Sequence, residues 1–182
     1  MALVKMKDLL RRAEEKNIGC GAFSVGNMEM VRGAIRAAEE LDTPIILQIA
    51  EVRLKNSPLH LMGPMMVQAA KEAKVDVAVH LDHGLTFETV DKALELGFTS
   101  VMLDASTLPF EENIARVKAV VEKARKYGAT VEAELGLVGG SEDGAVTTVS
   151  AAQIRMMRSF TQERQVLMHL QLPSVMPMVI IR

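Results

Sequence analysis

The chain has 182 residues, 49% hydrophobic and 24% charged, a balance typical of one globular core. A net charge of −2, an aromatic content of 3% and the absence of Trp argue against nucleic-acid and membrane-surface partners. Cys20 is the only cysteine, which excludes an internal disulfide. Residues 1–7 lack the apolar stretch of a signal peptide and no run is long enough to span a membrane, so we expect a cytoplasmic enzyme.

Short apolar runs alternate with amphipathic helical patterns along the chain. In order, the patterns predict strand 18–25, helix 28–41, strand 45–49, helix 61–73, strand 75–82, helix 89–96, strand 100–104, helix 109–128 and strand 130–135. Thr86 is the expected N-cap of the third helix and Gly97 its stop. This alternation predicts a parallel sheet, in either a (β/α)8 barrel or a doubly wound fold. No glycine-rich dinucleotide loop follows the first strand, which argues against a nucleotide-binding doubly wound fold.

Polar residues stand where the predicted strands end. They are Asn27, Gln48, Asp82, His83, Asp104 and Glu134. The carboxyl ends of barrel strands share one face, so we expect these side chains to meet in one cleft. Asp82-His83 is the most informative pair, because a metal-assisted enzyme needs a neutral imidazole to hold a divalent ion and an acid/base group beside it.

Each of these residues also has a structural interpretation. An aspartate at a strand end often caps a helix, and His83 taken alone is typical of a loop. Glu132 and Glu134 lie two apart and share one face, which could be solvated, although buried parallel strands rarely carry two carboxylates. His80 faces the same way as Asp82, and a purely structural hydrogen-bonding role is an equal alternative for it.

Several segments occur in an order that is specific as a set. They are Ala22-Phe-Ser-Val-Gly-Asn27, Pro44-Ile-Ile-Leu-Gln48, His80-Leu-Asp-His-Gly84, Ser100-Val-Met-Leu-Asp-Ala-Ser106, Glu132-Ala-Glu-Leu-Gly136 and Gly139-Gly-Ser-Glu-Asp143. Together they resemble the class II ketose-bisphosphate aldolases, the zinc-dependent fructose- and tagatose-bisphosphate aldolases, over residues 1–145.

The resemblance implies a TIM (β/α)8 barrel that binds Zn²⁺ and a phosphorylated ketose and assembles as a homodimer or larger. It implies roles for seven residues: metal binding by His83, Asp104 and Glu134, catalysis by Asp82 and Glu142, and substrate binding by Asn27 and Gln48. Asp82 would be the acid/base at a substrate hydroxyl, and Glu142, in a glycine-rich loop, would move a proton at the carbon nucleophile.

The sequence departs from the family pattern at several places. Ser24 and Gly26 stand where the family usually has Asn, and Ala105 stands where it has Gly. Two further zinc histidines, the later phosphate-binding motifs and the last strands have no counterpart. These departures indicate a divergent subgroup and leave the choice between fructose and tagatose bisphosphate open.

The composition changes after residue 145. Residues 146–182 are rich in Met and poor in acidic residues, and they lose the strand–helix alternation. Back-translating 165–181 with permissible codons and reading one nucleotide earlier can give a segment that resembles the family's next strand and its second zinc histidine. We therefore expect two parts: 1–145, a partial barrel of about five βα units, and 146–182, a frameshifted tail that packs loosely and in which His169 is not a zinc ligand.

The predicted function of the intact protein is reversible zinc-dependent cleavage of a ketose 1,6-bisphosphate to dihydroxyacetone phosphate and glyceraldehyde 3-phosphate. Two alternatives stay open at this point. One is another metal-dependent TIM-barrel enzyme, such as a hydrolase. The other is a catalytically inactive truncated fragment.

Overall fold

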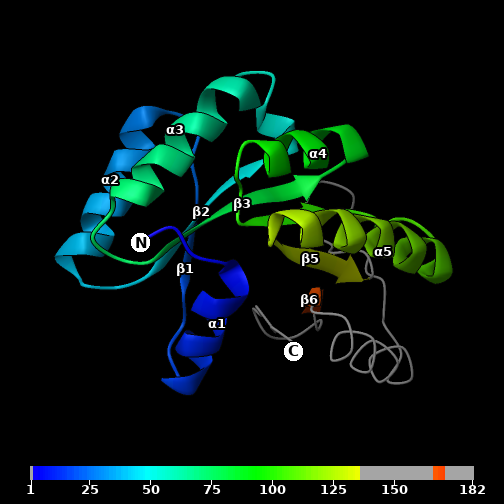
Figure 1. Ribbon diagram of the computed structural model, residues 1–182, viewed down its shortest axis with the longest axis horizontal. Helices are drawn as coiled ribbons and strands as arrows, with labels where there is room; N and C mark the ends of the chain where they lie inside the picture. Colours follow the sequence, from blue (N-terminus) through cyan, green and yellow to red (C-terminus); the bar gives the residue numbers. More distant parts are fainter. Residues whose placement is uncertain (1, 136–165, 171–182) are drawn as a thin grey trace, which may run out of the picture.

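The computed structural model of the protein describes residues 2–135 and 166–170 and shows one parallel sheet (Figure 1). The strands lie in chain order: β1 (Gly21–Ser24), β2 (Ile45–Ala50), β3 (Val77–Gly84), β4 (Ser100–Leu103), β5 (Thr130–Leu135) and β6 (Val166–Leu170). Every neighbouring pair is parallel. The five predicted strands and their sequential pairing are thus confirmed.

Helices connect β1 to β5 in turn, and one helix precedes β1. They are α1 (Met6–Glu15), α2 (Met28–Glu40), the short 3-10 helix η1 (Glu51–Arg53), α3 (Leu59–Glu72), α4 (Phe87–Glu95) and α5 (Phe110–Tyr127). Thr86 caps α4 as predicted, since its hydroxyl accepts the backbone N–H of Thr89. α1 and η1 were not among the predicted elements. No helix in the described part of the chain is both long and apolar enough to cross a bilayer.

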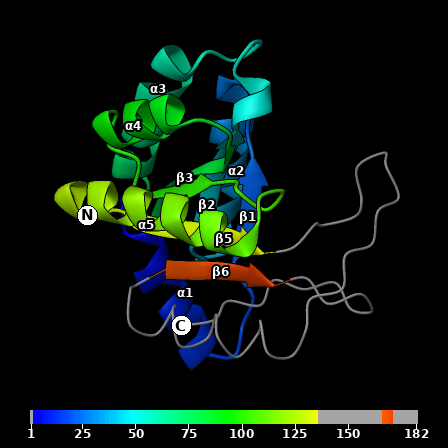
Figure 2. The same ribbon diagram turned by 90° about the vertical axis from the view of Figure 1, so that its right-hand side faces the viewer.

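The two faces of the sheet differ in chemistry because successive strand residues point to opposite sides. One face packs under α2–α5, which Figures 1 and 2 show on one side of the sheet. Its buried strand residues are all apolar: Ile45, Leu47, Ile49, Val77, Val79, Leu81, Val101, Leu103, Val131 and Ala133. Burying each large aliphatic side chain contributes about 1.5–3 kcal/mol, so this face supplies most of the core.

The opposite face is divided along the strands. Near their amino ends, Ile46 and Ala78 pack against Met6, Leu9 and Leu10 of α1, which lies across the sheet from the other helices (Figure 1). Farther along β1, β2 and β3 the same face becomes polar. The strand register aligns one polar row, consisting of Ser24, Gln48, His80, Ser100 and Thr130, which runs from the carboxyl end of β1 to the first residues of β4 and β5. α1 also meets this row, because the Lys7 backbone N–H donates to the Thr130 hydroxyl at 3.3 Å.

An irregularity in β3 decides which side chains reach the polar end. Leu81 pairs with Val101 and Gly84 pairs with Leu103, so β3 has one residue more than β4 between these pairs. Within this bulge His83 has φ 42°, in the left-handed region that a non-glycine residue adopts at a cost of about 1–2 kcal/mol. Bulges of this kind redirect side chains next to active sites.

The sixth strand differs from the expectation for the tail. We expected residues 146–182 to make few contacts with a five-strand core, but residues 166–170 pair with β5 along their whole length. The apolar run Val166-Leu-Met-His-Leu170 has the composition of a strand, and β5 would otherwise present an open edge to solvent. Residues 136–165 and 171–182 lie outside the described part, and so do the side chains of β6, including that of His169.

Gly84 provides a test of the bulge. A Cβ there would lie 2.4 Å from the carbonyl oxygen of Met102, so we predict that Gly84→Ala lowers the free energy of unfolding by about 1–3 kcal/mol. The matched control is Gly33, an exposed residue inside α2, where an added Cβ would meet no atom within 4 Å. Gly33→Ala should raise the free energy of unfolding by about 0.5–1 kcal/mol. Urea titration of both variants measures this, and equal effects would contradict the bulge geometry.

Candidate metal and acid/base site

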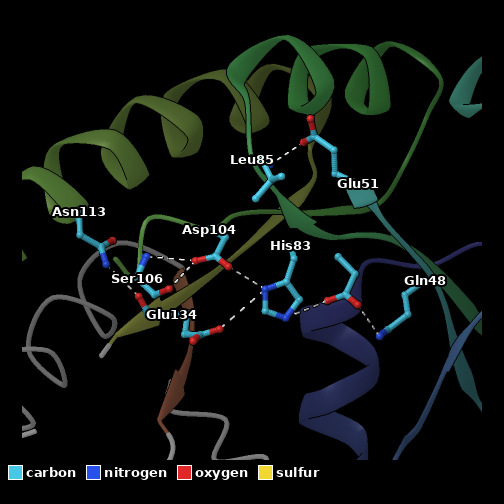
Figure 3. Close-up of polar contacts among 9 residues, drawn as sticks. Gln48, Glu51, His83, Leu85, Asp104, Ser106, Asn113 and Glu134 are labelled. Atoms are coloured by element: carbon cyan, nitrogen blue, oxygen red, sulfur yellow. Dashed lines mark hydrogen bonds and ion pairs between the residues drawn. The ribbon is translucent and has the colours of Figure 1, made fainter. Parts of the chain in front are cut away.

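A continuous chain of polar contacts crosses the carboxyl edge of the sheet (Figure 3). His83 is at its centre, with Nδ1 2.8 Å from Asp104 Oδ2 and 3.9 Å from Glu134 Oε2. The other ring nitrogen, Nε2, lies 3.9 Å from Asp82 Oδ1. Neighbouring side chains of a regular strand point to opposite faces, so it is the bulge in β3 that lets Asp82 and His83 face one another. The predicted meeting of Asp82, His83, Asp104 and Glu134 is confirmed.

His83 and Asp104 form a charge-assisted pair. The hydrogen bond with Asp104 raises the pKa of His83 to about 9, with the nearby Asp82 and Glu134 charges adding to it and burial opposing it. The same bond lowers the pKa of Asp104 to about 2, and the Ser106 hydroxyl and backbone N–H, which both donate to its other oxygen, lower it further. In the metal-free protein His83 is therefore an imidazolium at neutral pH.

Asp82 is oriented from the opposite side by β2. The Gln48 side-chain amide donates to Asp82 Oδ2 at 2.9 Å and lies 3.3 Å from the Ser24 hydroxyl. One carboxylate oxygen is thus held by Gln48, while Oδ1 points toward His83. Gln48 was predicted to lie near the substrate, and in the structure it is the hydrogen-bond partner of Asp82. Ser24, which contacts Gln48, is one of the residues at which the sequence departs from the family pattern.

The donor set formed by His83, Asp104 and Glu134 fits a divalent cation. One ligand atom from each residue can be chosen so that all lie within 4.8 Å of one another. Zinc bonds to imidazole nitrogen and carboxylate oxygen at about 2.0–2.2 Å, which places neighbouring ligand atoms of a tetrahedral site about 3.3–3.6 Å apart. The three side chains must therefore move closer together when they bind the ion. Glu134 is buried, and a buried carboxylate among other carboxylates is stabilised by a cation. The set is compatible with zinc and with other divalent ions that accept nitrogen and oxygen ligands.

A second group of polar side chains lies deeper on the same face. The buried His80 ring has Nδ1 2.9 Å from the Ser100 hydroxyl and Nε2 3.3 Å from Glu132 Oε2. Burial lowers the pKa of His80, against the raising effect of the Glu132 charge. His80 therefore joins β3 to β4 beneath the site through the Ser100 hydroxyl, which agrees with the structural alternative considered for it. Its Nε2 faces Glu132 of β5 without a hydrogen bond in the described part of the chain.

Two predicted residues are not joined to this network in the described part of the chain. Asn27 caps α2, because its side-chain oxygen accepts the Met30 backbone N–H at 2.9 Å. Glu142 lies outside the described residues. The structure thus assigns Asn27 a local capping contact, and a substrate contact remains a prediction for both residues.

Sequence reasoning missed two supporting residues, Asn113 and Glu51. Asn113 is buried in α5 and its side-chain amide donates to the Glu134 backbone carbonyl at 2.9 Å. The sequence did contain a signal for Asn113. It lies four residues before Val117, so its polar side chain falls on the apolar face of the predicted helix. Glu51 follows β2 and accepts hydrogen bonds from the loop after β3. Its signal was an acidic residue just beyond a strand whose end carries Gln48.

Fold and site together define an α/β chain of the barrel class, in which residues that could hold a metal ion gather at the carboxyl ends of parallel strands. The sequence model of the family described as fructose-bisphosphate aldolase class-II matches residues 4–169. The chain belongs to the class-II fructose-bisphosphate aldolase family. This match extends past residue 145, where the resemblance noted from the motifs ends.

Individual relatives agree with this assignment. The chain is 44% identical over 165 residues to the fructose-bisphosphate aldolase of Thermus caldophilus, which covers 86% of this chain and 54% of the relative. It is 45% identical over 149 residues to the probable fructose-bisphosphate aldolase of Bacillus subtilis (strain 168), covering 80% of this chain and 52% of the relative. The chain therefore spans about half the length of these relatives.

Solved structures support the partial-barrel fold. The YdjI aldolase from Escherichia coli K12 matches with a TM-score of 0.79 and 30% identity, over 93% of this chain and 61% of that one. The fructose-bisphosphate aldolase of Campylobacter jejuni matches with a TM-score of 0.78 over all of this chain and 62% of its own. At 18% identity the second match concerns the fold alone.

The pKa of His83 predicts how the stability of the metal-free protein depends on pH. Folding raises the pKa of His83 from 6.5 to about 9. The protonated imidazole therefore adds to the free energy of unfolding in full below pH 6.5, and this contribution is lost as the pH rises to about 9. We expect His83→Asn to remove this fall in the free energy of unfolding. Urea titrations with chelator across this window measure it, with His60→Asn, an exposed histidine of α3, as control. The assignment is wrong if the control flattens the profile equally.

Proposed function

We propose that this chain carries the metal ligands and the acid/base carboxylate of a zinc-dependent ketose-bisphosphate aldolase. The reaction is reversible cleavage of a ketose 1,6-bisphosphate to dihydroxyacetone phosphate and glyceraldehyde 3-phosphate. One observation carries the proposal: the β3 bulge brings the Asp82 carboxylate and the His83 imidazole to the same space beside Asp104 and Glu134. Relatives named fructose-bisphosphate aldolase support the substrate class.

Asp82 is the proposed acid/base group. In the cleavage direction it takes the proton from the C4 hydroxyl while the C3–C4 bond breaks, so that this oxygen becomes the aldehyde oxygen of glyceraldehyde 3-phosphate. In the reverse direction it returns the proton. The hydrogen bond from Gln48 holds one oxygen of Asp82, which fixes the carboxylate while the other oxygen is available to the substrate. Glu142 is proposed to deliver the proton to C3, completing the balance.

His83, Asp104 and Glu134 are the proposed ligands of the Zn²⁺ ion. When bound, the ion supplies Lewis-acid polarisation of the ketose carbonyl. The neighbouring carboxylates stabilise the protonated imidazole of His83, and zinc binding requires the imidazole to lose that proton. The affinity for zinc should therefore rise with pH. The site contains no lysine among these residues, and the polarised carbonyl makes a Schiff base unnecessary. A cytoplasmic location and a homodimeric or larger assembly are further parts of the proposal, supported by the single cysteine and by the family resemblance.

Substitutions in a protein whose reading frame after residue 144 is restored test these roles. Asp82→Ala should lower turnover about 10²–10⁴-fold, the range for a positioned acid/base group, while zinc content is retained. His83→Ala should lose zinc and turnover together. Coupled-enzyme assays with fructose and tagatose 1,6-bisphosphate, together with metal analysis, give both readouts. Glu88→Gln, on the exposed surface of α4, is the control. Near-normal activity in either site variant would remove that residue from its role.

The 182-residue chain assayed beside the frame-restored protein should show no measurable cleavage. The phosphate-binding motifs and the further zinc histidines implied by the resemblance have no counterpart in residues 1–145. An assay with a hydrolase substrate, such as an ester, distinguishes a different metal-dependent enzyme. Chelator-sensitive cleavage of fructose 1,6-bisphosphate by the 182-residue chain would contradict this expectation.

A further inference from the structure

The loop that follows His83 is held by a carboxylate from a different strand connection. Glu51 begins η1, directly after β2, and its Oε2 accepts the backbone N–H groups of Leu85 at 2.5 Å and Thr86 at 3.3 Å. Its Oε1 accepts the Thr89 hydroxyl at 2.9 Å and lies 3.3 Å from the Thr86 hydroxyl. Figure 3 shows Glu51 reaching Leu85 from the side of the sheet edge opposite Glu134.

These contacts begin two residues after His83, which has a strained backbone. A residue in the left-handed region keeps that conformation only when its surroundings fix it. On the β4 side, the Asp104 backbone N–H donates to the Gly84 carbonyl at 2.7 Å. On the β2 side, Glu51 holds the next N–H, that of Leu85. The bulge is therefore fixed between two anchors, one on each neighbouring strand.

We propose that Glu51 is a positioning residue for the metal site: it acts through the Leu85 and Thr86 backbone to hold His83 in the orientation that faces Asp104 and Glu134. Glu51 touches none of the three ligand side chains in its hydrogen bonds. This inference rests on the proposed metal site and adds to it a residue outside the ligand set. Groups that orient metal ligands typically change metal affinity 10–100-fold when removed.

A simpler account is that Glu51 only supplies negative charge at the amino terminus of α4, where it would stabilise the helix by interacting with the positive end of the helix dipole. Glu88 tests this account. It lies in the first turn of the same helix, is exposed and pairs with Lys92 at 2.6 Å. Glu88→Gln removes the same charge from the same helix end without altering the loop after His83. The dipole account predicts similar effects of substitution at both positions.

The experiment measures Co²⁺ binding to the full 182-residue chain by visible absorption, which reports both affinity and ligand geometry. We expect Glu51→Ala to raise the Kd for Co²⁺ about 10–100-fold and to change the spectrum. Glu51→Gln retains an acceptor oxygen for the Leu85 N–H and should recover part of the affinity. Glu88→Gln should bind as the unsubstituted chain does. Unchanged binding by Glu51→Ala, or equal losses in Glu51→Ala and Glu88→Gln, would overturn the proposal.

Amide hydrogen exchange separates failure of this inference from failure of the proposed function. The Asp104 N–H bonds across the bulge to Gly84 and does not touch Glu51, so faster exchange there reports loosening of the bulge itself. We expect this exchange to accelerate in metal-free Glu51→Ala and to be unchanged in Glu88→Gln. If the unsubstituted chain bound no Co²⁺, the metal assignment would fail, and the Asp104 exchange rate would still decide whether Glu51 positions the loop. Unchanged Asp104 exchange in Glu51→Ala would overturn the positioning role.

Discussion

The extra residue in β3 is the constraint on which the site depends. Backbone hydrogen bonds of parallel strands fix which side chains share a face, and a regular strand would send Asp82 and His83 to opposite faces. The bulge places both on the polar face at the cost of a left-handed residue and of a glycine packed against the Met102 carbonyl. One local irregularity thus brings an acid/base carboxylate and a metal-ligating imidazole to the same edge.

The rest of the fold keeps that edge polar and ordered. The apolar face of the sheet is buried under α2–α5, and α1 covers the amino end of the other face. His80 links β3 to β4 below the site through the Ser100 hydroxyl, and its other ring nitrogen lies 3.3 Å from Glu132 of β5. Close carboxylates raise the pKa of His83, and the same negative charge attracts a divalent cation. Stability of the metal-free protein and metal binding therefore depend on the same charges.

The strand positions could be predicted from the sequence because short apolar runs mark β2 to β5. The meeting of Asp82, His83, Asp104 and Glu134 could also be predicted, because these residues stand where the strands end. Other features depend on partners that are distant along the chain. The bulge exists only relative to β4, and Glu51 acts on a loop more than thirty residues away. Asn27, by contrast, makes a contact with a near neighbour in the sequence, because its side chain caps the amino terminus of α2. Residues 166–170 pair with β5 because that strand has an open edge. The composition of residues 146–182 alone does not predict this pairing.

A structure of the 182-residue chain crystallised with zinc, with the ion located by anomalous scattering, tests the central claim most directly. We predict one ion bound by the His83 imidazole and the Asp104 and Glu134 carboxylates, at the distances of about 2.0–2.2 Å typical of zinc with nitrogen and oxygen ligands. Asp82 should stand beside it without being a ligand. An ion bound elsewhere, or held by His169 in place of this set, would contradict the account.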